Sequence, residues 1–389
     1  MLTRLSEATR ESEGSKAGAL GVLLRERLPV PNGFVVGAAR STNFTAGHVL
    51  RDAVNRELKR MGDPFAAVRS SSMNEDKADA SAAGQFESII GVRGVDDVCQ
   101  AIETCRQAAN AKRVGDYRAR MGEASTQELG IATLVQPVVK ANVSGVMFTP
   151  QEPEGSIRIE SSWGLGLSVV GGTITPDTFD LYPDGVLRCE IGSKQNRVDL
   201  DHEHGGVVTT AVTSHQQLTR TLDDVTVEKL AVLGKRVAEI LGQPQDIEWA
   251  IQDDIVWILQ ARPITAALPV LRTLRPPEQV DALHGVPGSH GMVTATARVV
   301  RSPSDFPTVT RDEILICPYT DPAWTPLFAV AAGVITETGG VLSHAAIVAR
   351  EYGIPAVLGV VGATTRIEGG SRITIDGSAG TVTLLQPDQ

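Results

Sequence analysis

The chain has 389 residues, of which 42% are hydrophobic and 21% are charged. This composition excludes a disordered or fibrous protein, and a length well above the roughly 100 to 200 residues of one domain predicts two or three domains with buried cores. Acidic side chains outnumber basic ones by 46 to 36, which gives a net charge of −10 and excludes the concentrated positive surface that nucleic-acid binding requires.

The sequence also argues against a membrane segment, a zinc site and disulfides. No apolar run approaches the roughly 20 residues that cross a bilayer, and the N-terminal stretch MLTRLSEATRESEGSK lacks the apolar core of a signal peptide. The four cysteines form no CxxC pair, so we expect reduced thiols. We therefore expect a cytoplasmic protein with neither membrane nor nucleic-acid partners.

The first part of the chain has a mixed α and β pattern. From RLPVPNGFVVGAA onward, β-rich apolar runs alternate with helical-period stretches such as VCQAIETCRQAANAKRVGDYRARM, which indicates an α/β or α+β fold. The predicted strands lie at 66–69, 131–139, 144–148, 157–161, 246–251 and 255–260. Gln252, Asp253 and Asp254 separate the last two of them, which is a hairpin signal.

A proline-containing stretch, AALPVLRTLRPPEQVDA, follows these strands and lacks any periodicity. It predicts a flexible linker at 266–283 between a first domain at 1–265 and a second at 284–389. The second domain is predicted as a compact β/α unit, because short strands surround one helix that carries HAAIVAREY. These strands are expected within 291–300, 313–318, 332–337, 356–360, 372–377 and 380–385.

His344 is the first candidate for chemistry. Ser343 precedes a helix-forming run and is expected to cap it, which places His344 at the first helical position. A phosphate on that imidazole would lie beside free backbone N–H groups and the positive end of the helix dipole. Gly339 and Gly340 permit close backbone approach. On composition alone, an ordinary surface histidine at a helix start is the more common interpretation.

A second candidate is the polar segment AVRSSSMNEDKADASAAGQFES, which begins at Ala67. Its hydroxyls and small residues allow backbone N–H groups to close over phosphates, and Arg69 can neutralise their charge. An exposed, turn-rich loop is the alternative.

The predicted hairpin supplies a third candidate. Glu248 and Gln260 lie on paired strands and can project to one face, and Arg262 follows on the same face by the strand period. A carboxylate and an amide oxygen suit Mg²⁺. Arg262 can compensate charge on a group in transfer. An ordinary edge hairpin is the alternative.

These segments together resemble one group of families. The stretch TETGGVLSHAAIVAREYGIPAVLGV is similar to the phosphohistidine signature of the swivelling domain in phosphoenolpyruvate synthase, pyruvate phosphate dikinase and rifampin phosphotransferase. The flanks YTDPAWTPLF and GSRITIDGSAGTVTLL extend the similarity over about 284–385. The N-terminal part resembles the nucleotide-binding domain of the same families. The resemblance therefore implies an ATP-grasp-like domain of two subdomains followed by a small β/α swivelling domain.

The resemblance also implies roles for individual residues. It makes His344 the phosphorylated residue, Arg262 a catalytic residue, and Glu248 and Gln260 the ligands of Mg²⁺. Leu167 stands where these families customarily have a glutamate. The residues implied to bind ATP are Lys16, Arg69, Ser81, Gly84, Gln136 and Val138.

The implied chemistry is a relay in which His344 attacks the β-phosphate of ATP, AMP leaves, and phospho-His344 serves a second acceptor. The large acceptor domains of those families do not fit between or after the two recognised domains in 389 residues. We therefore expect a small-molecule hydroxyl or amine acceptor bound between the two domains. Two alternatives stay open: an ATP-using component of a split enzyme whose acceptor domain is a separate protein, and a phosphohistidine carrier or regulator.

Overall fold

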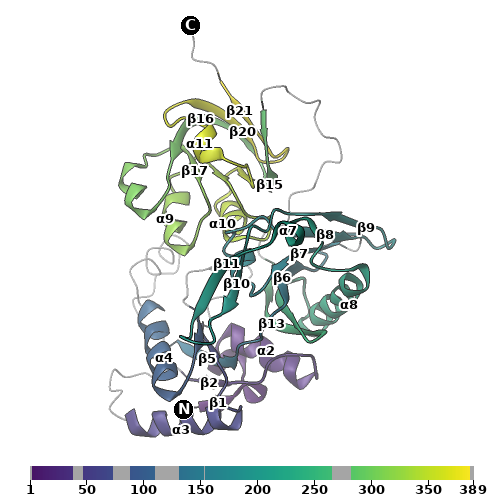
Figure 1. The fold of residues 1–389 in the computed structure, drawn as a ribbon, viewed down its shortest axis with the longest axis vertical. Helices are drawn as coiled ribbons and strands as arrows, with labels where there is room; N and C mark the ends of the chain where they lie inside the picture. The colour runs from purple at the N-terminus through teal and green to yellow at the C-terminus, as the bar shows by residue number, and fades with distance from the viewer. Residues whose placement is uncertain are drawn as a thin grey trace.

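The computed structural model describes residues 2–37, 47–72, 88–109, 131–152, 154–264 and 282–385 (Figure 1). Their strands form sheets of five, two, six and eight strands. Across these described ranges, no helix is both long enough and apolar enough to cross a membrane. The chain ends lie at opposite ends of the molecule, with the eight-stranded sheet at the C-terminal end (Figure 1).

The five-stranded sheet is antiparallel and has the order β1-β2-β5-β3-β4. Two helices pack on it, because the apolar faces of α3 (Gly47–Arg60) and α4 (Val95–Ala109) share one core with the strands. Short η1 (Leu5–Glu7) and α1 (Arg10–Glu13) lead into α2 (Ser15–Arg25). The strands are β1 (Leu2–Arg4), β2 (Phe34–Val36), β3 (Ala66–Ser71), β4 (Ser88–Val92) and β5 (Ala132–Pro137).

The six-stranded sheet is also antiparallel, with the order β13-β12-β6-β7-β8-β9. Helix α8 (Asp224–Leu241) covers one face, where Val227, Leu230 and Val237 join the core around Trp249. Short helices α6 (Leu167–Val170) and α7 (Ser214–Leu218) flank the sheet. The strands are β6 (Val143–Phe148), β7 (Ile157–Trp163), β8 (Asp177–Leu181), β9 (Leu187–Glu190), β12 (Gln245–Gln252) and β13 (Ile255–Pro263), with the separate ribbon β10 (Asn196–Leu200) and β11 (Val207–Ala211).

The eight-stranded sheet contains only residues beyond 281 and has the order β14-β21-β20-β16-β17-β18-β19-β15. Its centre is parallel, from β16 to β19, and its flanks are antiparallel. Helix α10 (His344–Tyr352) packs against it. The other elements are β14 (Ala282–His284), β15 (Val286–Ser289), β16 (Met292–Val299), η3 (Pro303–Thr308), β17 (Ile314–Cys317), η4 (Pro322–Trp324), α9 (Thr325–Phe328), β18 (Gly333–Thr336), β19 (Ala356–Leu358), α11 (Ala363–Arg366), β20 (Arg372–Asp376) and β21 (Thr381–Leu384).

The predicted strands and hairpin are confirmed. In the hairpin, Gln252 pairs with Ile255, so Asp253 and Asp254 alone form the turn. Their φ angles of 52° and 61° are those of a two-residue turn that matches the strand twist. The predicted fold class is confirmed, and the limits of the two domains stay a prediction. Most of the predicted linker, and the predicted helix beyond Ala109, lie outside the described residues.

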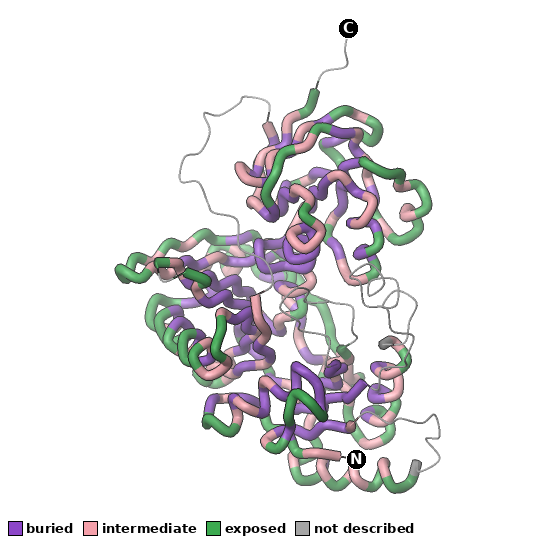
Figure 2. Tube along the Cα trace, turned by 180° about the vertical axis from the view of Figure 1, so that it is seen from behind, coloured by how far each residue is buried: buried purple, intermediate pink, exposed green. Residues whose placement is uncertain are grey.

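A buried contact joins two parts of the chain, residues 2–264 and residues 282–385, which contain the eight-stranded sheet. The apolar residues of this junction come from β6, α6, the turn after α6 and the segment that precedes α10, namely Val146, Phe148, Val169, Ile174, Val341 and Leu342. Figure 2 shows buried chain where α10 meets the lower part of the molecule. The loop that leads into α10 is therefore enclosed between the two parts.

A buried ion pair stabilises the turn region beside this junction. The Lys194 ammonium group contacts the Asp177 carboxylate, and neither side chain is exposed to solvent. Asp177 also accepts hydrogen bonds from the backbone N–H groups of Gly192 and Thr221, at 2.9 and 2.8 Å. The pair thus links three segments that are distant in sequence.

We expect Lys194→Met to lower the free energy of unfolding by about 3–5 kcal/mol, because Asp177 would keep a buried charge without its cation. The exposed pair Arg51–Asp96 is the matched control, and Arg51→Met should cost far less than Lys194→Met, because solvent screens that pair. Urea unfolding of both variants measures the difference. Equal losses in the two variants would contradict the argument.

Candidate active site

Five of the residues predicted to bind nucleotide or metal line one cavity. The cavity has a volume of about 200 Å³ and lies between the five-stranded and six-stranded sheets, with apolar walls that include Leu165, Leu167 and Trp249. An apolar cleft with a few convergent polar groups is the usual form of a small-molecule site. The five residues are Arg69, Gln136, Val138, Glu248 and Gln260.

Strand pairing positions the polar side chains of this cavity. Glu248 on β12 and Gln260 on β13 are direct register partners, as their spacing predicts. The Gln136 side-chain amide donates to the Pro31 carbonyl at 2.7 Å, and the Arg69 guanidinium donates to the Leu259 carbonyl at 2.9 Å. These hydrogen bonds fix the directions of the Gln136 and Arg69 side chains.

The other predicted nucleotide-binding residues are not among those that line the cavity. Lys16 is buried at the start of α2, and its ammonium group donates to the Ser70 carbonyl at 3.2 Å, beside Arg69. Ser81 and Gly84 lie outside the described residues. The Lys16 ammonium group thus contacts the residue that follows Arg69, and its partner there is a backbone carbonyl.

Arg262 is held by a carboxylate that the sequence analysis did not single out. Asp246 is its register partner across the hairpin and accepts from Nε at 2.9 Å and from an Nη at 2.8 Å. Burial raises the pKa of Asp246, and the charge of Arg262 opposes that shift. The signal was available, since Asp246 precedes Glu248 by two residues on the same strand.

His344 begins α10, as predicted, and is almost fully buried. The Thr320 hydroxyl lies 2.9 Å from Nδ1 and the Thr325 hydroxyl 3.5 Å from Nε2, while the Phe328 ring packs edge-on. Burial lowers the pKa of His344 to about 4, and the nearby positive charge of Arg262 acts in the same direction. The imidazole is therefore neutral at neutral pH and carries an available lone pair.

The two threonines were missed by the sequence analysis as site residues. Both lie in the stretch YTDPAWTPLF, which had been singled out only as a flank of the family resemblance.

The prediction that Ser343 caps α10 with its side chain is wrong. Ser343 occupies the position before the first helical residue, but its hydroxyl donates to the Gly340 carbonyl at 2.8 Å. The tight turn after Gly340 puts that carbonyl within reach, and the hydroxyl serves the turn. The backbone N–H groups of Val341 and Leu342, which precede the helix, bind Glu160 from the other part of the chain.

Arg350 has a structural partner within its own domain. Its guanidinium donates to the Gly288 carbonyl on β15 at 3.0 Å. Burial lowers the pKa of Arg350 to about 10, and the charges of Glu160 and Asp246 oppose that shift. This position favours a structural role over direct contact with phosphate.

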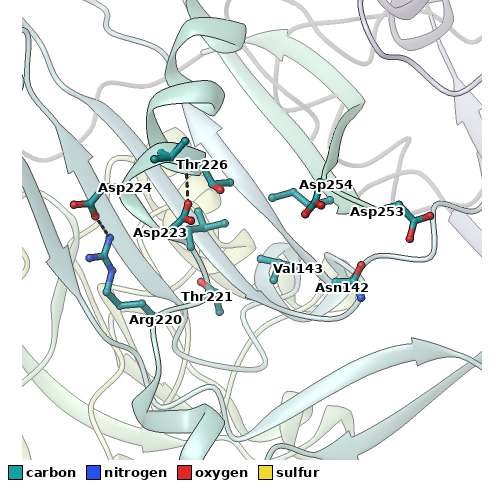
Figure 3. Close-up of a pocket in the computed structure, with 12 residues that line it drawn as sticks. Asn142, Val143, Arg220, Thr221, Asp223, Asp224, Thr226, Asp253 and Asp254 are labelled. Atoms are coloured by element: carbon teal, nitrogen blue, oxygen red, sulfur yellow. Dashed lines mark hydrogen bonds and ion pairs between the residues drawn. The ribbon is translucent and has the colours of Figure 1, made fainter.

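A second, shallower cavity lies at the start of α8 and beside the hairpin turn (Figure 3). Two of its carboxylates already have structural partners: Asp223 accepts from the Thr226 backbone N–H at 2.8 Å, and Asp224 binds Arg220 at 2.6 Å. None of the predicted site residues line it. The candidate active site is therefore the cavity that contains Arg69 and the junction that contains His344.

Residues 50–269 match the family described as pyruvate phosphate dikinase, AMP/ATP-binding domain, and residues 309–380 match the PEP-utilising enzyme, mobile domain. The first match covers more than half of the chain, and the chain belongs to the pyruvate phosphate dikinase and phosphoenolpyruvate synthase family.

Relatives with curated names agree with this assignment. A probable phosphoenolpyruvate synthase from Archaeoglobus fulgidus is 32% identical over 95% of this chain and 56% of its own length. One from Methanothermobacter thermautotrophicus is 32% identical over 95% of this chain and 61% of its own length. The phosphoenolpyruvate synthase of Deinococcus radiodurans is 35% identical over 85% of this chain and 45% of its own length. The chain thus spans about half the length of these relatives.

We expect the imidazole of His344 to titrate with an apparent pKa of about 4 and to show no change between pH 5 and pH 8. The neutral ring is favoured wherever the pH exceeds that value, because burial opposes the charged form. NMR titration of the histidine resonances, assigned with His344→Gln, measures this. A midpoint near the ordinary value of about 6.5 would show an imidazole in contact with water.

Proposed function

We propose that this chain is an ATP-dependent phosphotransferase of the dikinase type that transfers a phosphoryl group through His344. One observation carries the proposal: the start of the helix that bears His344 is buried against the ATP-binding part of the chain. Arg262 lies near enough for its charge to lower the pKa of His344. These positions support the proposal, because they bring an imidazole, a guanidinium group and the cavity to one face of the six-stranded sheet.

The cavity supports binding of the base of ATP. Its volume of about 200 Å³ is below the roughly 300–1,000 Å³ of typical ligand pockets, so the phosphates would extend out of it. Gln136 offers a polar group among apolar walls, and Arg69 offers a positive charge. We propose that Lys16, Ser81 and Gly84 contribute to phosphate binding, as the sequence resemblance implies.

The oxygens of Glu248 and Gln260 fit a magnesium ion. Both side chains line the same cavity on paired strands, and they present one negative charge and only hard oxygen donors. In the described part of the chain, no group of three His, Cys, Asp or Glu side chains could hold a metal. Bound Mg²⁺ would therefore depend on nucleotide oxygens and would offset the charge of the phosphates.

The imidazole has one nitrogen placed for attack. We assign the ring proton to Nδ1, because its contact with the Thr320 hydroxyl is the shorter one; the lone pair is then on Nε2, whose contact with Thr325 is long. Nε2 forms a bond to the β-phosphorus, the bond from that phosphorus to the α–β bridging oxygen breaks, and AMP leaves. The ring then passes its Nδ1 proton to water as the neutral phosphoramidate forms.

Two further bond changes complete the proposed cycle. Water attacks the γ-phosphorus and releases inorganic phosphate, which leaves a single phosphoryl group on His344. An acceptor oxygen or nitrogen then attacks this group, the P–N bond breaks, and the acceptor proton returns to the ring. Arg262, oriented by Asp246, would stabilise negative charge that develops during transfer.

The acceptor we propose is a small molecule with a hydroxyl or amine. An acceptor site on a separate protein is the second candidate, and the name phosphoenolpyruvate synthase that relatives carry favours phosphoenolpyruvate formation there. Release of AMP that increases with a small metabolite distinguishes the first candidate. Transfer that requires an added protein distinguishes the second, and stable label without turnover indicates a carrier or regulator.

We expect incubation with Mg²⁺ and ATP, labelled separately at the β and γ positions, to give acid-labile and base-stable label on the protein. AMP rather than ADP should accumulate. The His344→Ala variant should bind ATP normally and take up no label, because the nucleophile alone is lost. Gel electrophoresis of the labelled protein and chromatography of the nucleotides measure both results.

Label on His344→Ala, or ADP as the nucleotide product, would contradict the proposed relay. The control is Thr365→Ala, which alters an exposed side chain of α11 that binds only its own turn. This variant should label at the wild-type rate.

We also expect Glu248→Ala to reduce the Mg²⁺-dependent part of ATP affinity by roughly tenfold, which corresponds to about 1.4 kcal/mol. The loss of one charged oxygen ligand would weaken metal binding and leave the contacts with the base intact. Calorimetric titration of ATP with and without Mg²⁺ isolates this part. An equal loss under both conditions would assign Glu248 to the nucleotide rather than to the metal.

A further inference from the structure

Glu160 contacts the histidine loop from the other part of the chain. Its carboxylate accepts hydrogen bonds from the backbone N–H groups of Val341 and Leu342, at 2.6 and 3.2 Å. Val341 and Leu342 immediately precede Ser343 and His344. A single carboxylate thus binds two consecutive amides of the segment that carries the nucleophile.

The position of Glu160 explains why it meets this loop. It lies in the middle of β7, flanked by β6 and β8, where it pairs with Val146 and Thr178. Residues before and after it, Ile159 and Ser161, point to the opposite face, and Ile159 belongs to the core beneath α8. The Glu160 side chain therefore projects from the open face of the sheet toward the eight-stranded part of the chain.

The loop is shaped to receive this carboxylate. A Cβ atom on Gly340 would lie within 2.5 Å of the Glu160 carboxyl carbon, so any larger residue would displace the carboxylate. Two more hydrogen bonds cross the junction nearby, from the Gly339 backbone N–H to the Ile174 carbonyl at 3.1 Å and from the Thr338 hydroxyl to the Gly172 carbonyl at 2.7 Å. Glu160 supplies the only side-chain carboxyl group among these contacts.

We propose that Glu160 is a positioning residue that holds the His344 loop docked on the ATP-binding part and releases it when the second domain moves to the acceptor. When the loop is docked, two backbone amides replace water as the hydrogen-bond donors to the Glu160 carboxyl group. Undocked, the same face of β7 is open to solvent and water replaces the amides. Both states satisfy the carboxylate, so the contact is reversible.

The electrostatic surroundings fit a contact of moderate strength. Burial raises the pKa of Glu160 to about 7, while Arg158 and the two amides act in the opposite direction. Arg158 is itself committed to Asp180, at 2.7 Å. The backbone amides of Val341 and Leu342 are thus important partners of Glu160. The cost of removing the carboxyl group from water offsets part of the stabilisation that these hydrogen bonds provide.

Hydrogen–deuterium exchange of the full chain without nucleotide tests this contact, because the amides of Val341 and Leu342 report it directly. We expect Glu160→Ala to speed exchange of peptides covering 338–343 by roughly tenfold or more. Peptides from β17 (Ile314–Cys317) should not change. The exposed Glu152→Ala is the matched control and should leave both sets of peptides as in the wild type.

Gly340→Ala provides a second route to the same loss, because its methyl group would displace the carboxylate. In the double variant Glu160→Ala/Gly340→Ala the two effects should not add, since both remove one contact. Unchanged exchange in Glu160→Ala, or fully additive effects in the double variant, would overturn the proposal.

The link to catalysis rests on the proposed function and is measured separately. We expect Glu160→Ala to label with phosphate at least roughly tenfold more slowly than the wild type, with ATP affinity unchanged, because only docking is impaired. Wild-type labelling rates in Glu160→Ala despite a released loop would overturn the positioning role. A wild type that takes up no label, with the exchange results intact, would overturn the proposed function and still support the docking contact.

Discussion

A polar loop buried between two parts of one chain is the constraint on which the rest of the structure depends. The backbone N–H groups before His344 have no water to bind in this position, and a buried amide without a partner is costly. Those of Val341 and Leu342 are satisfied from across the junction by the Glu160 carboxyl group, and that of Gly339 by the Ile174 carbonyl. The apolar residues around the loop set the area of the contact, and these hydrogen bonds set its register.

Burial is the main reason why His344 is neutral at the junction, and the positive charge of Arg262 acts in the same direction. Arg262 is paired with Asp246, and Glu160 and Arg350 influence one another across the interface. A proton on the imidazole would add an unpaired cation beside a guanidinium group. A phosphoryl group would instead add about two negative charges, which a positive neighbour stabilises. The same environment therefore disfavours the protonated nucleophile and favours the phosphorylated product.

Local patterns predicted a large share of the fold. The strands around 144–148 and 246–260 follow from β-rich runs and from the two aspartates that tolerate positive φ in the hairpin turn. Register then placed Glu248 opposite Gln260, as the strand period required. Helix α10 also begins where the run HAAIVAREY predicts. All of these depend on neighbours in sequence or on one direct strand pair.

The residues that could not be predicted depend on contacts between distant segments. Glu160 stands between Arg158 and Ser162 on one face of a strand, a pattern that equally describes a solvated surface, and its partner Val341 is 181 positions away. Thr320 meets His344 only because two parallel strands bring their loops to the same edge of the sheet. Sequence alone also gave Ser343 a capping role, because it could not show that the preceding carbonyl turns back to bind the hydroxyl.

The double glycine before His344 shows how one sequence feature serves two physical needs. Gly339 has a φ of 109°, a conformation that side chains oppose, so the chain can turn sharply into the helix. Gly340 needs no unusual φ, and its missing side chain instead leaves room for the Glu160 carboxylate. The sequence predicts close approach at these glycines, and the group that approaches Gly340 is the Glu160 carboxyl group of the protein itself. A loop without a side chain at that point can separate from one partner and bind another, as the proposed relay through His344 requires.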